Sequence, residues 1–156
     1  MKPSLLILFI ISSSLFSQSK IVVKGSDTLG AKMIPKLAEA YQNKFPSTKF
    51  EIAAEGSSTG IAAIIDNTAD VGMSSRELKG KEKASAGANG VFLFKTVVAS
   101  DAVAIIVNEE NPLNSLTSKE VERIFTGDVS NWSSVGGPSG KISVYTRSTS
   151  SGTYAF

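Results

Sequence analysis

The chain has 156 residues, of which 42% are hydrophobic, with a formal net charge of +2 and neither cysteine nor histidine. This length suffices for one or two domains with a buried core. The absence of cysteine excludes disulfide bonds and lipid attachment at an amino-terminal cysteine. No basic block is interleaved with aromatic residues, so the composition gives no support to nucleic-acid binding.

The first residues have the pattern of an export signal. Lys2 precedes an apolar run at residues 5–11, and serine-rich residues 12–19 follow. The apolar run is too short to span a membrane, and this order is typical of a secretory signal peptide. We therefore expect residues 1–19 to be a signal peptide. The mature chain is then secreted, periplasmic or otherwise extracytoplasmic, without insertion into a membrane.

The next part of the chain predicts an α/β fold. Strand-like runs at residues 21–24, 50–54 and 70–74 alternate with apolar residues at helical spacing in residues 34–45 and 59–66. This βαβαβ order predicts parallel strands joined by right-handed crossovers.

The middle of the chain is less regular. We expect one or two helical turns within the polar residues 77–89, and we expect Arg76 to pair with a nearby acid or carbonyl. Two apolar runs follow, at residues 91–98 and 102–108. Their composition predicts extended segments that cross between two lobes.

A further helix and strand are predicted after these runs. Thr117 and Glu120 have the spacing of a capping box, which predicts a helix that begins there. Residues 142–145 alternate as a strand does, and Trp132 in the loop before them is predicted to pack beneath that loop.

Three loops combine glycine with hydroxyl side chains, at residues 25–28, 56–60 and 147–153. The third loop begins with Arg147, and we expect a helix near Thr153, where unpaired N–H groups and the helix dipole favour an anion. Loops at the carboxyl ends of parallel strands meet at one edge of an α/β sheet, where such folds bind ligands. Loops with many donors and few carboxylates suit a small oxyanion.

Other kinds of site have weaker patterns. Residues 56–60 also fit the G-x-S-x-G nucleophile elbow with Ser58 as nucleophile, but the usual triad requires a histidine and the sequence has none. Residues 25–32 miss the spacing of a phosphate-binding P-loop, because Ala31 is one residue too many. The acidic residues have no spacing typical of metal ligands. We therefore expect a protein that is not an enzyme and has no metal or cofactor, with a serine hydrolase using Ser58 as a less favoured alternative.

The sequence from Lys20 to Phe156 resembles the phosphate-specific substrate-binding proteins of bacterial ABC transporters. The resemblance rests on Gly25-Ser-Asp-Thr-Leu, Gly56-Ser-Ser-Thr-Gly, Ala69-Asp-Val-Gly-Met-Ser-Ser-Arg, Thr126-Gly-Asp with Asn131-Trp132, and Arg147-Ser-Thr-Ser-Ser-Gly-Thr. It implies an α/β fold of the periplasmic-binding-protein type II, with two lobes. Members of that family are considerably longer, so we expect the fold to be incomplete at the carboxyl terminus.

The resemblance also implies a domain organisation. We expect the first lobe over residues 20–98, and a hinge crossing with the start of the second lobe over residues 99–156. Phe156 is then a truncation point.

The ligand-binding residues follow from the same resemblance. It implies that the first lobe donates the Thr28 hydroxyl, the Leu29 backbone N–H and Ser57. It implies Arg147 as the charge partner, with Ser151, Gly152 and Thr153 as donors from the other lobe. Well-known members carry an aspartate where this chain has Ser75, and that aspartate is thought to accept the proton of phosphate. Ser75 can also accept a hydrogen bond, but it leaves open another oxyanion such as sulfate.

The function implied is extracytoplasmic binding of inorganic phosphate for delivery to the permease subunits of an ABC transporter. Two lobes would close around the anion by a hinge motion. A dehydrated anion requires many directed donors, and neutral dipoles with one arginine meet this need. A sensor module without transport is an alternative, because it requires the same closing cleft.

Overall fold

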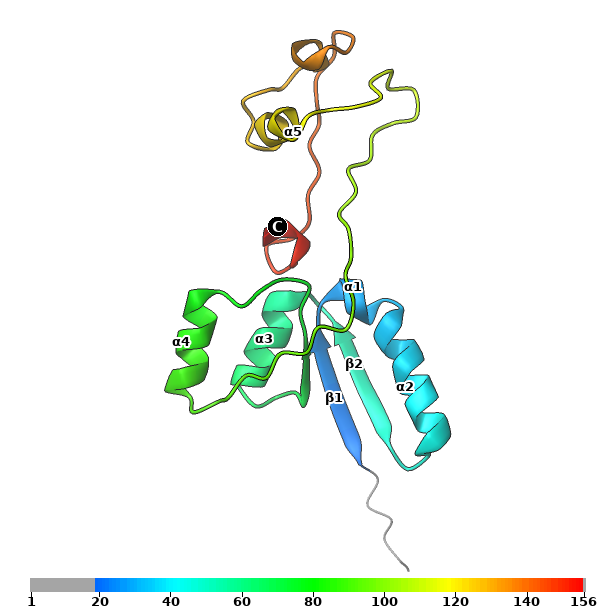
Figure 1. The fold of residues 1–156 in the computed structure, drawn as a ribbon, viewed down its shortest axis with the longest axis vertical. Helices are drawn as coiled ribbons and strands as arrows, with labels where there is room; N and C mark the ends of the chain where they lie inside the picture. The colour runs from blue at the N-terminus through cyan, green and yellow to red at the C-terminus, as the bar shows by residue number, and fades with distance from the viewer. Residues whose placement is uncertain (1–18, 156) are drawn as a thin grey trace, which may run out of the picture. The chain divides into compact units, whose positions relative to one another are not determined.

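The computed structural model describes residues 19–155. The chain divides into two compact units, one up to Ser74 and the other from Ser75. Figure 1 shows the helices and strands of both. The predicted signal peptide lies outside the described residues except for Ser19. The predicted lobe boundary at residues 98–99 concerns a complete two-lobed protein and stays a prediction.

A parallel sheet forms the centre of the first unit. Its strands β1 (Lys20–Gly25), β2 (Lys49–Ala54) and β3 (Val71–Met73) lie in the order β2-β1-β3. Gly25 at the end of β1 is in register with Ala54 on one side and Met73 on the other. The three strands therefore end at the same level, and the loops that follow them begin side by side.

Helices connect these strands as the βαβαβ prediction requires. They are α1 (Asp27–Gly30), α2 (Met33–Lys44) and α3 (Ser57–Ile65). Pro35 lies in the first turn of α2, where a missing N–H costs no helical hydrogen bond. The sequence pattern does not predict α1, because a single turn is too short to show periodicity.

The core of the first unit lies between α3 and the sheet. Val23 of β1, Met73 of β3, and Ile61 and Ile65 of α3 are all buried, and α3 contacts both β1 and β3. Helix α2 contacts β2 and α1 instead, with Ala38 as its buried residue. Burial of the apolar side of α3 holds its first turn at the end of β1.

The second unit contains four short helices within the described residues. They are α4 (Gly80–Ala88), α5 (Ser118–Phe125), and the 3-10 helices η1 (Trp132–Val135) and η2 (Thr153–Ala155). The expected helical turns of residues 77–89 are confirmed as α4, and a helix does begin at Thr153, although it is a 3-10 turn.

The predicted capping box at the start of α5 is confirmed. Thr117 Oγ1 accepts a hydrogen bond from the Glu120 N–H at 3.3 Å, and the Glu120 carboxylate accepts one from the Thr117 N–H at 2.7 Å. The Thr117 hydrogen bond to the Glu120 carboxylate also lowers the pKa of Glu120. These contacts satisfy two backbone donors where the helix begins.

A small apolar cluster follows α5. It comprises buried Ile124, Val129, Val135 and Ile142, with partly buried Leu113, Leu116 and Trp132 against it. Trp132 therefore packs as the sequence predicts. The side-chain oxygen Oδ1 of Asn131 connects this loop, because it accepts hydrogen bonds from the N–H groups of Ser133 at 3.0 Å and Gly140 at 3.1 Å.

The strand expected at residues 142–145 is absent from the described residues. Residues 91–108 and 142–145 contain no strand, and only an isolated bridge joins Asn131 and Lys141. Phe92, Phe94 and Ile106 are 99%, 95% and 89% exposed. The strand prediction for residues 142–145 is wrong because apolar alternation favours a strand only where a neighbouring strand supplies hydrogen-bond partners. The crossing between lobes expected for residues 91–98 and 102–108 stays a prediction. Within residues 19–155, no helix has the length and apolar character needed to cross a bilayer.

Candidate functional site

The loops after β1 and β2 are joined directly. The carbonyl oxygen of Gly25 accepts hydrogen bonds from the N–H groups of Glu55 at 2.8 Å and Gly56 at 2.9 Å. The first hydroxyl-rich loop and the second therefore share one backbone junction at the carboxyl edge of the sheet.

The end of β3 is joined to the same junction. The Ser26 N–H donates to the carbonyl oxygen of Met73 at 3.0 Å. Gly25 has φ +135°, and a Cβ there would lie 2.1 Å from that carbonyl oxygen. Only glycine allows the backbone to adopt this φ and to lie so close to the Met73 carbonyl oxygen. Glycine at position 25 is therefore required for the close contact between the ends of β1 and β3.

Thr28, Leu29 and Ser57 lie on the two helices that leave this junction. Thr28 is exposed and Leu29 is half-buried, both within α1. Ser57 is the first residue of α3 and is fully buried. The first N–H groups of α3 have no acceptor within the helix, and its dipole is positive at this end. These three predicted residues thus follow two strands that end side by side.

Ser26 is a residue of this edge that the sequence analysis missed. Ser26 is 2% exposed, and its carbonyl oxygen accepts the Gly30 N–H at 2.9 Å at the start of α1. Hydrophobic periodicity does not predict that a serine between Gly25 and Asp27 is buried. Only its backbone contact with Met73 reveals that Ser26 connects two loops of the site.

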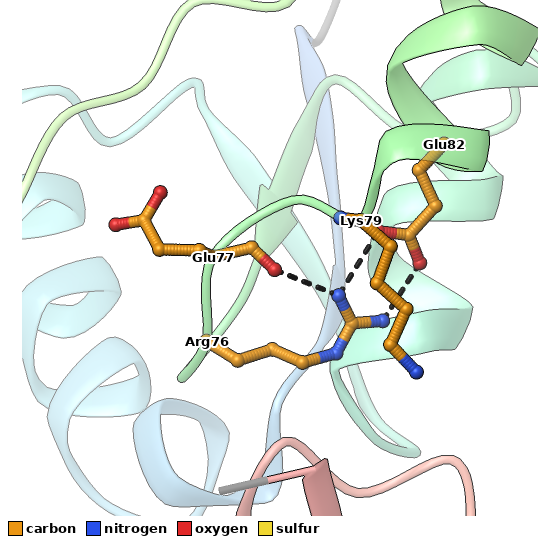
Figure 2. Close-up of polar contacts among 4 residues, drawn as sticks. All are labelled: Arg76, Glu77, Lys79 and Glu82. Carbon is orange, nitrogen blue, oxygen red and sulfur yellow. Dashed lines mark hydrogen bonds and ion pairs between the residues drawn. The ribbon is translucent and has the colours of Figure 1, made fainter.

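Ser75 follows β3 by two residues and begins the second unit. Ser74 and Ser75 are both half-buried. The next residue, Arg76, forms an ion pair with Glu82 of α4, in which Nη2 and Oε1 are 2.7 Å apart (Figure 2). The prediction that Arg76 pairs with a nearby acid is confirmed.

The Arg76 and Glu82 side chains shift each other's pKa. The hydrogen bond from the guanidinium lowers the pKa of Glu82, against the opposing effect of burial, and the Lys79 N–H lowers it further. The same hydrogen bond raises the pKa of Arg76. Glu82 therefore stays ionised below the pH at which an ordinary glutamate protonates.

The remaining predicted residues form one turn of the second unit. The Ser151 N–H donates to the carbonyl oxygen of Ser148 at 3.0 Å, and the Thr153 N–H donates to Ser151 Oγ at 3.2 Å. Ser151 and Gly152 are buried, Thr153 is half-buried and Arg147 is exposed. Ser151, Gly152 and Thr153 therefore lie in one hydrogen-bonded turn, a few residues after Arg147 in the sequence.

The geometry at Ser58 differs from that of a nucleophile elbow. Ser58 is the second residue of α3, and among the described non-glycine residues only Asn67 has a positive φ. A nucleophile elbow places its serine on a sharp, strained turn, which Ser58 does not occupy. The described residues also contain no group of three acidic, histidine or cysteine side chains arranged to hold a metal ion.

A family model described as the PBP superfamily domain matches residues 12–156. The chain belongs to the PBP superfamily. Its parallel sheet and flanking helices are the part of the periplasmic-binding-protein fold that the described residues form, which confirms the predicted fold class.

Curated relatives of this PBP-superfamily chain are named for phosphate. "Phosphate-binding protein PstS 2" of Streptococcus agalactiae is 40% identical over 117 residues, which cover 75% of this chain and 38% of the relative. "Phosphate-binding protein PstS" of Borreliella burgdorferi is 32% identical over 161 residues, which cover 99% of this chain and 56% of the relative. The chain thus spans about half the length of these two relatives, or less.

A solved structure is similar over most of this PBP-superfamily chain. It is a protein from Clostridium perfringens, assigned as a phosphate ABC transporter substrate-binding protein and solved with bound phosphate. The two share 36% sequence identity with a TM-score of 0.78, over 88% of this chain and 54% of the other.

Proposed function

We propose that this chain is the phosphate-binding part of an extracytoplasmic substrate-binding protein that delivers inorganic phosphate to an ABC transporter. The observation that carries the proposal is the similarity to the Clostridium perfringens structure with bound phosphate, at 36% identity. The names of the curated relatives support the same ligand.

The junction at the end of the sheet supports an anion as ligand. Thr28 lies on the helix that follows β1, and Ser57 lies at the amino terminus of α3, which follows the neighbouring strand β2. Directed donors at a helix amino terminus replace the water around an anion without introducing a second charge. This arrangement permits capture of an oxyanion and its later release.

The second unit contributes the remaining groups in this proposal. Arg147 supplies the positive charge, and Ser151, Gly152 and Thr153 supply further donors. The part played by Arg147 is to compensate the charge of an ion that loses its water when two lobes close. The protein performs no chemistry on the ligand, and the relatives are likewise named as binding proteins.

Titration calorimetry of the full-length gene product with phosphate and with sulfate tests the ligand. We expect phosphate to bind and sulfate to compete weakly. A clear preference for sulfate would overturn the assignment, and it would place the cause at Ser75, where a carboxylate is absent.

Location and partners complete the proposal. We propose that the chain is exported by its amino-terminal signal peptide and presents phosphate to permease subunits of the transporter. Cell fractionation with mass spectrometry of the mature amino terminus checks export, and we expect it to start near Lys20. Recovery of the uncleaved chain in the cytoplasm would contradict export.

A further inference from the structure

The loop after β3 is tied to α4 by a nearly buried ion pair. Arg76 Nη1 lies 2.9 Å from Glu82 Oε2, and Nη2 lies 2.7 Å from Oε1, so the guanidinium and the carboxylate pair through two parallel hydrogen bonds. The side chains of Arg76 and Glu82 are only 7% and 14% exposed. Figure 2 shows the two groups facing each other, with the Glu77 carboxylate directed away from them.

The same two side chains also hold the backbone between them. Arg76 Nη1 donates to the carbonyl oxygen of Glu77 at 2.9 Å, and the Lys79 N–H donates to Glu82 Oε2 at 2.8 Å. Three of these four hydrogen bonds connect residues 76–79 with Glu82 in the first turn of α4, and the fourth lies within the loop. Because a buried charge that loses its partner is costly, this loop has one strongly preferred conformation.

Apolar packing contributes little to holding α4. Ala86 is the buried residue of the helix, and Gly80 and Gly87 would each accept a Cβ without any neighbour within 4 Å. The helix also begins with glycine, which is a poor helix former. The ion pair is therefore the main described contact that fixes the start of α4 to the loop.

We propose that Arg76 and Glu82 are positioning residues for the anion site, which they serve by orienting Ser75. This inference rests on the proposed function. Ser75 is bonded directly to Arg76, so a fixed Arg76 limits the conformations of the Ser75 hydroxyl and backbone. A donor that is already ordered loses less entropy when the ligand binds, and the affinity for phosphate is correspondingly higher.

The alternative is that Arg76 binds the anion directly. Both terminal nitrogens of its guanidinium already donate to Glu82, and the carboxylate compensates the positive charge. The two roles predict opposite results when the carboxylate is neutralised. If Arg76 binds the anion directly, loss of its ion pair with Glu82 frees the guanidinium and tightens phosphate binding. If Arg76 orients Ser75, loss of the ion pair leaves Ser75 less ordered and weakens phosphate binding.

The test is a double-mutant cycle with the full-length protein and inorganic phosphate as the probe. Glu82→Gln, Ser75→Ala and the combined variant are titrated by calorimetry. We expect Glu82→Gln to weaken phosphate binding by about tenfold, the size of a typical coupling between neighbouring residues. In the Ser75→Ala background the same change has little further effect, because the side chain that it orients is gone.

Glu77→Gln is the matched control. It removes the exposed ion pair with Lys95 from the same loop but leaves the backbone oxygen that Arg76 contacts. We expect its affinity to match the wild type. If Glu82→Gln does not fold, replacing both partners by Arg76→Met with Glu82→Leu removes the pair without leaving a buried charge unpaired, and the cycle is repeated with that variant.

The outcomes separate the two proposals. Loss of affinity that depends on Ser75 supports the inference. Equal losses in both backgrounds, unchanged binding, or tighter binding by Glu82→Gln each overturn it while leaving phosphate binding intact. A wild-type protein that does not bind phosphate overturns the proposed function, and the inference with it.

Discussion

Gly60 in the first turn of α3 lies directly against Gly25 at the end of β1. A Cβ on Gly60 would be 2.6 Å from the Gly25 Cα and 2.5 Å from the carbonyl oxygen of Lys24. No side chain fits at this contact without moving the backbone. The approach brings the amino terminus of α3 to the ends of β1 and β3.

Replacing Gly60 by alanine is therefore expected to destabilise the protein. The added methyl group meets three backbone atoms within 2.8 Å, and overpacking of this kind costs about 1–3 kcal/mol. Urea unfolding of the full-length protein measures the change. Gly87→Ala is the matched control, since Gly87 is also helical but has open space around it. We expect that variant to gain about 0.5–1 kcal/mol, and equal effects of both substitutions would disprove the close contact.

Loss of the Ser57 hydroxyl is expected to weaken phosphate binding. Ser57 is 0% exposed at the start of α3, so no water can easily replace its hydroxyl. A hydrogen bond to a charged group contributes about 1.5–3 kcal/mol, so calorimetry of Ser57→Ala should show phosphate affinity reduced by at least about tenfold. Ser85→Ala, on an exposed face of α4, serves as the control. Undiminished affinity in Ser57→Ala would remove Ser57 from the site.

Arg147 is expected to supply the charge that holds the anion. Arg147→Ala should reduce the binding free energy by about 1.5–3 kcal/mol, and the remaining affinity should depend less on salt concentration. Arg123→Ala removes an equally basic and exposed side chain from α5 and should have no effect. Binding that changes by less than about 1 kcal/mol would refute the role of Arg147.

The Arg76–Glu82 pair predicts a stability change at acid pH. The hydrogen bond from Arg76 lowers the pKa of Glu82 in the folded protein. Such a carboxylate contributes its stability above the unfolded pKa of about 4.3, and it loses that contribution as the pH falls through the lower folded pKa.

Denaturation of the wild type and of Glu82→Gln across this pH range tests the linkage. Near neutral pH we expect the wild type to have a larger free energy of unfolding than Glu82→Gln. We expect this difference to shrink as the pH falls and Glu82 becomes protonated. A difference that stays constant down to about two pH units below the ordinary glutamate pKa would contradict the linkage.

Local patterns predict the elements of the first unit well. Apolar periodicity locates α2, α3 and the three strands within a few residues, because each of these elements packs one side against a neighbouring element. The sequence likewise predicts that Thr117 pairs with Glu120 and that Arg76 pairs with an acid, because the two residues of each pair lie three and six positions apart.

The same patterns mislead where the partner is distant. Residues 142–145 read as a strand, yet no described strand pairs with them. Their hydrogen-bond partners cannot be inferred from their own composition. Ser26 is missed for a related reason, since the acceptor of its backbone N–H is Met73, which lies far along the chain.

The sequence by itself determined the order of the three strands and of helices α2 and α3. It also determined the hydroxyl-rich loops and the family to which they point, because all of these depend on neighbouring residues. The tertiary structure alone decided that the loops after β1, β2 and β3 share one junction. That outcome depends on strand register and on the absence of side chains at Gly25 and Gly60, where backbones distant in sequence come into contact.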